Sequence, residues 1–272
     1  MFGFFFKKNT CDLWDNLFYT VICNFFSLAA LFASFLMLAA ALNAPLSGGL
    51  KAGTVLISLA AGCTLTCTVT IALGDNAARI SQFNSARYGN FFRRIASSLK
   101  DGALCGIFLA AVISIAVISM PFYYRMWNSS RNPLWFVFMV IIFWFLVTTV
   151  FALQWFLPVR SLLHNGLLKC LKKSYIIFFD NMGFTFAVTL VNILNTLISV
   201  ITFGLYPGTA GIVLTSTNAL RILLYKYDWL EVNPGLSPKE RRNVPWSDLL
   251  AKDKKTLGPR TLKGFFFPWK EK

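Results

Sequence analysis

Long apolar runs, separated by shorter polar segments, make up most of this chain. Because about 20 helical residues cross the hydrocarbon core of a bilayer, runs of this length predict transmembrane helices. Six such runs occupy roughly residues 17–42, 52–73, 103–123, 134–157, 175–203 and 209–225. The pattern therefore predicts an all-α fold, a polytopic membrane helix bundle of about six transmembrane helices with amphipathic cytoplasmic segments.

Turn-forming residues separate these runs. Residues 43–49 contain Asn, Pro and Gly and end the first run. Pro158 is expected to close the fourth run, because proline disrupts a helix interior. The short turn at residues 204–208 predicts that the last two runs form an antiparallel hairpin. Within the C-terminal tail, residues 247–250 predict a short helix.

Two polar segments keep apolar residues at intervals that suit a helix. The first, residues 74–101, contains Ile80, Phe83, Tyr88, Phe91, Phe92 and Ile95 at helical spacing. The second, residues 160–173, is basic and rich in leucine. Both are predicted to be amphipathic, and the first is expected to lie in part along the membrane interface.

The distribution of Lys and Arg predicts the orientation. The loops after the second and fourth runs carry five and four basic residues, whereas those after the first, third and fifth carry one, two and none. Basic loops stay on the cytoplasmic side, so both ends of the chain are expected there. This gives a cytoplasmic interfacial N-terminus (1–16), a six-helix transmembrane domain (17–226) and a basic cytoplasmic tail (227–272).

The composition agrees with a membrane protein. The chain is 56% hydrophobic and 14% charged, and its formal net charge is +15. In a soluble protein such a charge would indicate nucleic-acid binding. Here the basic residues flank apolar runs, so we assign the charge to topology and to anionic lipid headgroups, with no nucleic-acid partner.

The two ends of the chain share an aromatic and basic pattern. Residues 3–8 read Gly-Phe-Phe-Phe-Lys-Lys, and residues 264–270 read Gly-Phe-Phe-Phe-Pro-Trp-Lys. Such segments suit the headgroup zone of the inner leaflet, although the tail could instead dock into a partner. The candidate interface or partner contacts are Phe265, Phe266, Phe267, Trp269, Arg93, Arg94, Lys172 and Lys173.

A few polar residues lie inside or at the ends of the last two apolar runs: Asp180, Asn181, Asn192, Asn195 and Arg221. In an antiparallel hairpin, Asp180 and Arg221 would lie at similar depth and could form an ion pair. Such a pair would be either part of a transport path or a structural clip, and the structural interpretation is the simpler one. The asparagines fit interhelical hydrogen bonds, with a polar substrate lining as the alternative.

The sequence lacks the usual motifs of enzymes and metal proteins. Its six cysteines form no C-x-x-C pair, and His164 is the only histidine, whereas structural zinc sites usually need four such ligands. No H-E-x-x-H, G-x-S-x-G or Walker A motif is present. We therefore expect no catalytic residues, no metal and no cofactor. Gly102-x-x-x-Gly106 is a weak helix-packing motif.

Several stretches resemble the YesL-like family of bacterial membrane proteins. They are Asp15-Asn16-Leu17, Asp75-Asn76-Ala77-Ala78-Arg79, Asn90-Phe91-Phe92-Arg93-Arg94, Pro158 and Asp180-Asn181. The resemblance covers roughly residues 10–226, and the tail departs from it. It implies a six-span protein of the bacterial cytoplasmic (inner) membrane that is linked with carbohydrate uptake.

This resemblance leads to the functional expectation. It implies an accessory role beside an importer of the ATP-binding-cassette class. Neither cytoplasmic loop contains the E-A-A…G coupling motif, so the chain is not expected to be the permease itself. The expected partners are the lipid bilayer and other membrane protein subunits, such as components of such an importer. The alternative is a stand-alone solute transporter that uses polar groups of the last two runs.

Overall fold

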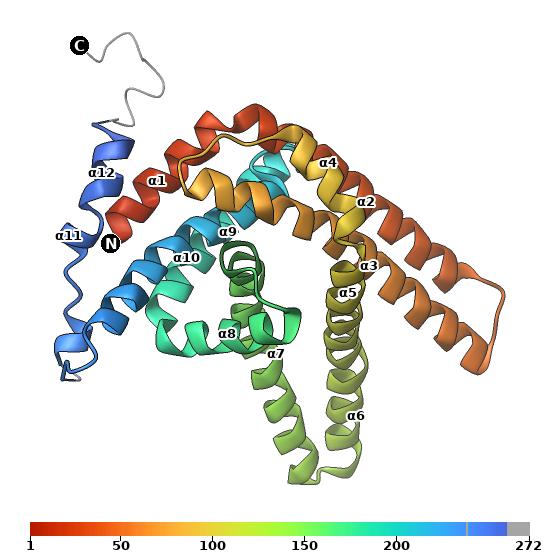
Figure 1. Cartoon of the computed structure of the whole chain (residues 1–272). Helices are drawn as coiled ribbons and strands as arrows, with labels where there is room; N and C mark the ends of the chain where they lie inside the picture. Colours follow the sequence, from red (N-terminus) through yellow and green to blue (C-terminus); the bar gives the residue numbers. More distant parts are fainter. Residues whose placement is uncertain (238, 260–272) are drawn as a thin grey trace.

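The structure is a computed structural model that describes residues 1–237 and 239–259, and this part of the chain is helical (Figure 1). Its elements are α1 (Phe2–Asp15), α2 (Leu17–Asn43), α3 (Gly48–Ser81), α4 (Tyr88–Ser97), α5 (Leu99–Ser114), the π-helical turn η1 (Ile115–Ser119), α6 (Met120–Ser130), α7 (Pro133–Leu163), α8 (Leu167–Asp180), α9 (Met182–Ile201), α10 (Gly208–Val232), the 3-10 turn η2 (Glu240–Arg242), α11 (Trp246–Leu249) and α12 (Ala251–Leu257). The predicted all-α class is confirmed.

Five helices are long and apolar enough to cross a membrane. They are α2, α3, the continuous segment Leu99–Ser130, α7 and α9. These findings make the chain a membrane protein by composition and helix length. The helix α10 is not among the five candidates, so the count of six crossings stays a prediction.

Two long helical hairpins project from a common junction. Figure 1 shows that α2 and α3 extend to the right, whereas α6 and α7 extend downward, so the two hairpin loops lie far apart. Within the first hairpin the hydroxyl of Ser34 donates to the carbonyl of Gly62 at 2.9 Å. A Cβ atom at Gly62 would lie 3.0 Å from Cβ of Ser34, so the missing side chain lets the helices approach closely.

The two hairpins are joined where α3 crosses α5. A side chain at Gly102 would overlap Thr68, and one at Gly106 would overlap the backbone of Thr64. The Gly-x-x-x-Gly motif, a weak signal in the sequence, therefore lies at a close contact between helices. Small residues at this spacing allow two helix backbones to touch.

The fourth apolar run does not end at Pro158 as expected. Helix α7 continues through Pro158 to Leu163. Pro158 and Val159 are buried, so contacts with neighbouring helices hold the last turns in place. The second run likewise continues as a helix to Ser81, and within this extension Gly74 packs tightly against Ser161 of α7.

The expected fifth run is broken. Helix α8 ends at Asp180, Asn181 adopts a non-helical conformation with φ −133° and ψ 45°, and α9 starts at Met182. The amide of Asn181 donates to the carbonyl of Ile177 and to the hydroxyl of Tyr227. Such side-chain bonds compete with the regular helix and explain the break.

The described part of the tail packs on the protein itself. The short helix predicted at residues 247–250 is confirmed as α11, and α12 follows it. Leu250 and Leu257 are buried in one core cluster with Phe4 and Phe5 of α1. Figure 1 shows α12 beside α1. Phe265, Phe266, Phe267 and Trp269 lie outside the described residues.

Candidate functional site

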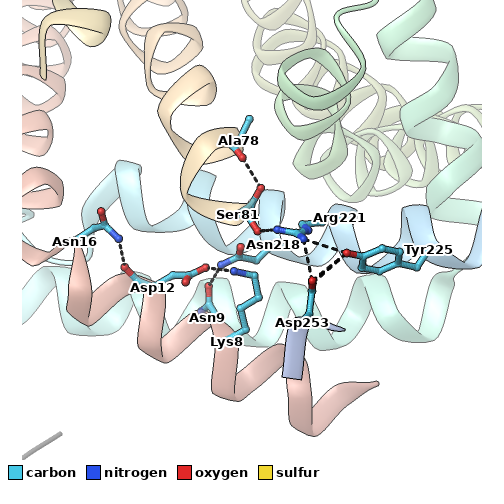
Figure 2. A network of polar contacts seen from close by, with 10 residues as sticks. All are labelled: Lys8, Asn9, Asp12, Asn16, Ala78, Ser81, Asn218, Arg221, Tyr225 and Asp253. Carbon is cyan, nitrogen blue, oxygen red and sulfur yellow. Dashed lines mark hydrogen bonds and ion pairs between the residues drawn. The ribbon is translucent and has the colours of Figure 1, made fainter. Parts of the chain in front are cut away.

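Four charged side chains meet where α1, α3, α10 and α12 come together (Figure 2). They are Lys8, Asp12, Arg221 and Asp253, and they form two ion pairs. The two positive and two negative charges balance within the junction. The residues come from the first and last described helices and from α10, so tertiary packing assembles the group.

Lys8 and Asp12 form a buried ion pair within α1. The Lys8 Nζ lies 2.7 Å from Asp12 Oδ2, and Lys8 is fully buried. Burial lowers the pKa of Lys8, and the nearby Asp12 partly opposes this shift. Burial likewise raises the pKa of Asp12, against the effect of Lys8. Each ionised group therefore depends on its partner, because either one alone would be costly to bury.

Arg221 connects α10 to α3 and α12. Its guanidinium donates to the carbonyl of Ser81 and, at 3.1 Å, to Oδ1 of Asp253. The hydroxyl of Tyr225 lies 3.2 Å from both carboxylate oxygens of Asp253. Asp253 is 4% exposed, so the tail contributes a buried carboxylate rather than a surface one.

Phe83 lies between the two cations. Its ring centroid is 3.9 Å from Nζ of Lys8 and 5.0 Å from Cζ of Arg221. Phe83 adopts a left-handed conformation with φ 61°, which is uncommon for a bulky residue and turns its ring into the junction. The amide of Asn218 donates to Asn9 Oδ1 at 3.4 Å and ties α10 to α1.

The expected pair between Asp180 and Arg221 is wrong. Asp180 instead pairs with Lys226 at 2.9 Å and accepts a hydrogen bond from Tyr227, while Arg221 pairs with Asp253. The break after Asp180 sets this carboxylate level with Lys226 rather than with Arg221. Burial raises the pKa of Asp180, but hydrogen bonds from Lys226 and Tyr227 outweigh it and hold the pKa below its ordinary value.

The polar residues of α9 bond to α10. Asn192 donates to the hydroxyl of Ser216 at 3.2 Å, and Asn195 donates to Thr215 at 2.9 Å. Asn181 lies at the base of this hairpin, where it accepts a hydrogen bond from Lys226. These contacts match the interhelical hydrogen bonds expected from the sequence.

The basic residues predicted as partner contacts lie on two separate helices. Arg93 and Arg94 are exposed on α4, and Arg94 forms an ion pair with Asp75. Lys172 and Lys173 are exposed on α8. Figure 1 shows α4 and α8 at different places on the molecule, so the structure does not gather these four residues into one cluster.

Two hollows adjoin the polar contacts. A cleft of about 540 Å³ beside the junction is lined by Asp12, Asp15, Tyr19 and Tyr88, among others. A smaller cavity of about 200 Å³ lies between α3, α7 and α10 and is lined in part by Thr70, Gln154, Pro158 and Ser216. Among residues 1–237 and 239–259, no group of three or more His, Cys, Asp or Glu residues could hold a metal ion.

Sequence reasoning missed most of the junction. It selected Arg221 but not Lys8, Asp12 or Asp253. The signal available was the spacing of Lys8 and Asp12, which places opposite charges one helical turn apart in an aromatic segment. Asp253 gave no local signal, because its partner lies 32 residues away along the chain.

No protein-family model, curated protein or solved structure matches this chain. The resemblance to the YesL-like family therefore stays a prediction.

Proposed function

We propose that this chain is a non-enzymatic accessory subunit of a membrane transport complex in the bacterial cytoplasmic membrane. The observation that carries the proposal is the bonding of the α9 and α10 polar groups to one another. Asn192 and Asn195 each donate one amide hydrogen bond to a hydroxyl of α10, and Asp180 forms an ion pair with Lys226. Groups committed to such contacts stabilise a scaffold rather than line a solute path.

The apolar faces of the long hairpins are suited to contacts with other subunits. Only 11% of the most hydrophobic 18-residue stretch of α7 is buried inside the protein. The mean hydropathy of this stretch is the highest among the five candidate helices. Phe136, Ile141, Trp144 and Val150 are exposed on this helix. Lipids and helices of a partner subunit are the chemistry that such a face accepts. The resemblance to the YesL-like family adds carbohydrate uptake as the process served.

A stand-alone transporter is the second candidate, and the 200 Å³ cavity favours it. Pro158 has no N–H, so the carbonyl of Gln154 loses its usual partner one turn away, and both residues line this cavity. Ser216 also lines it. Carbonyls freed at helix interruptions coordinate substrates and ions in known transporter folds.

Affinity purification from native membranes tests the accessory role. A tagged full-length chain is extracted in mild detergent, and co-purifying proteins are quantified by mass spectrometry. We expect membrane transport subunits at a fixed ratio to this chain. The variant Lys172→Glu with Lys173→Glu reports whether the exposed basic face of α8 contributes to their recovery. Recovery of this chain alone would contradict the proposal.

Uptake by the purified chain in lipid vesicles separates the two candidates. An accessory subunit gives no uptake of labelled mono- or disaccharides by itself. A transporter gives uptake that Ser216→Leu abolishes by filling the cavity, whereas Thr196→Leu, at an exposed position on α9, leaves uptake unchanged. The second pattern would replace the accessory role with transport.

A further inference from the structure

We propose that the α9–α10 hairpin does not cross the membrane, and that the apolar face of α9 is embedded in the cytoplasmic leaflet. The surface in question is one side of α9, and its partner is the acyl region of that leaflet. The proposal concerns topology and lipid contact, and it is independent of the accessory role. Its basis is the depth at which neighbouring helices hold the hairpin tip, residues 202–207.

Helix α2 fixes the tip near its own cytoplasmic end. The amide of Asn24 donates to the carbonyls of Leu205 and Pro207 at 2.9 and 2.6 Å, and its oxygen accepts from Ala210 N at 2.8 Å. Asn24 lies on the second turn of α2, which starts at Leu17. About 28 Å of helix, at about 1.5 Å per residue, separates it from the outer end of α2.

Contacts with α3 and α7 independently place the start of α10 at the same depth. The start of α10 shares the 200 Å³ cavity with Thr70 of α3 and Leu157 of α7. Thr70 lies about 33 Å along α3 from its outer end at Gly48, and Leu157 lies about 36 Å along α7 from Pro133. The hydrocarbon core is about 30 Å thick, so the tip stays on the cytoplasmic side of three different helices.

The rest of the hairpin runs away from the two membrane hairpins. Figure 1 shows α10 running to the lower left from the place where the two long hairpins meet. From the same place α2 and α3 run to the right, and α6 and α7 run downward. Towards its other end α10 carries the ion pair of Lys226 with Asp180 and the contact of Arg221 with Asp253. Charged groups and the tail helix α12 therefore accompany it on the cytoplasmic side.

One face of α9 is apolar and exposed over its whole length. Its residues recur at helical spacing and are 43–78% exposed: Met182, Phe186, Leu190, Ile193, Leu194, Leu197 and Ile201. The opposite face, with Val188, Val191 and Asn195, is buried in the protein. The exposed side of α9 is uncharged and apolar, so it can contact acyl chains while the buried side packs on the protein. Phe203, at the tip, is 89% exposed and continues this face.

This arrangement leaves four crossings: α2, α3, the segment Leu99–Ser130, and α7. It places loops 44–47 and 131–132 outside and both ends inside, in agreement with the charge count. The helix α9 satisfies the length and composition of a crossing helix. Its depth is set instead by the contacts of Asn24 at the tip.

Spin-label depth measurement in lipid nanodiscs tests the proposal. Labels are attached at Phe186→Cys, Leu190→Cys, Leu197→Cys and Ile201→Cys in a background in which the half-buried Cys67 and Cys105 are replaced by alanine. Collision rates with oxygen and with a water-soluble nickel chelate report the depth of each label. The matched control set lies on exposed positions of α7: Leu134→Cys, Ile141→Cys, Trp144→Cys and Val150→Cys.

We expect the depth of the α7 labels to pass through a maximum at the bilayer centre. The α9 labels are expected to favour oxygen over nickel at every position, with shallow depths and no central maximum. A central maximum along α9 would show that it crosses and would overturn the proposal. Protection of the α9 labels from both reagents would show a protein covering the face, which also overturns it.

Labelling of the tip gives a second readout. A membrane-impermeant maleimide is added outside right-side-out vesicles that carry Phe203→Cys, Ser47→Cys or Ser129→Cys. The two loop positions are expected to react, and position 203 is expected to stay unlabelled. Labelling of position 203 from outside would overturn the proposal.

Discussion

The ammonium group of Lys8 is enclosed completely by the protein, and the carboxylate of Asp12 is its counter-charge. Two buried ions attract each other strongly, but both lose hydration. The pair therefore adds little to the free energy of unfolding. Loss of one member alone is strongly destabilising, because the other charge stays buried without a partner. Phe83 adds a ring face to the same ammonium group.

Removing Asp12 alone is therefore expected to be more damaging than removing both ions. Asp12→Ala leaves Lys8 buried without its partner, and we expect the free energy of unfolding to fall by about 3–5 kcal/mol. The double variant Lys8→Met with Asp12→Ala is expected to recover much of that loss. The measurement is the thermal unfolding midpoint in one fixed detergent, and Asp248→Ala, at an exposed carboxylate, is the control. A double variant less stable than Asp12→Ala would contradict this account.

At the scale of elements, the crossing of α3 and α5 depends on glycine. Gly106 touches the backbone of Thr64, which cannot move without moving the whole helix. Gly53, on α3, has no atom within 4 Å of its added Cβ position. The two glycines thus have the same intrinsic helix cost but very different surroundings.

Alanine substitutions at Gly106 and Gly53 test whether the helix crossing depends on glycine. Gly106→Ala is expected to lower the thermal midpoint, because the methyl group pushes the helices apart. Gly53→Ala is expected to leave the midpoint unchanged or to raise it, since alanine favours a helix by about 0.5–1 kcal/mol over glycine. Equal effects of the two substitutions would mean that the helix crossing tolerates a side chain.

The tail segment 246–258 acts as a second packed element. Asp253 reaches Arg221, Leu250 and Leu257 enter the core, and Lys7 donates to the carbonyl of Gly258 at 3.0 Å. These contacts join the tail to both α10 and α1. Asp253 is buried, so we expect loss of its ion pair with Arg221 to weaken the packing of the tail more than loss of any other of these contacts.

Limited proteolysis measures whether this segment stays packed. Trypsin is expected to cut slowly at Lys252, Lys254 and Lys255 in the native protein. Asp253→Ala removes the carboxylate from Arg221 and is expected to speed cleavage there severalfold, while Asp248→Ala does not. Unchanged cleavage of the Asp253→Ala protein would show that the apolar contacts and the Lys7 hydrogen bond hold the tail without this ion pair.

For the whole molecule, contact between α1 and the tail predicts that both lie on one side of the membrane. Lys7 and Gly258 are hydrogen-bonded, so an even number of crossings separates them. The count of basic residues separately predicts that this shared side is the cytoplasmic one.

Epitopes added at the two ends test this conclusion. Protease added to sealed inverted vesicles is expected to remove both epitopes, because both face the bath. In right-side-out vesicles both epitopes are expected to survive. Loss of one epitope and survival of the other in either preparation would place the ends on opposite sides.

The helical elements were largely predictable from the sequence, and the candidate site was not. Long apolar runs gave α2, α3, the Leu99–Ser130 segment and α7, because backbone groups in lipid must bond within their own segment. The ends of elements were less predictable. Pro158 stayed helical through packing, and Asn181 broke a helix through its side-chain bonds.

The sequence by itself determined that the chain is an apolar, helical membrane protein, because hydropathy and helix length are local properties of each segment. Tertiary structure alone decided which charges meet. Asp180 had two plausible cationic partners on α10, and the position of the helix break selected Lys226. It also decided where Asn24 bonds and thus the depth of the hairpin tip, since that depends on neighbours about 180 residues apart in the chain.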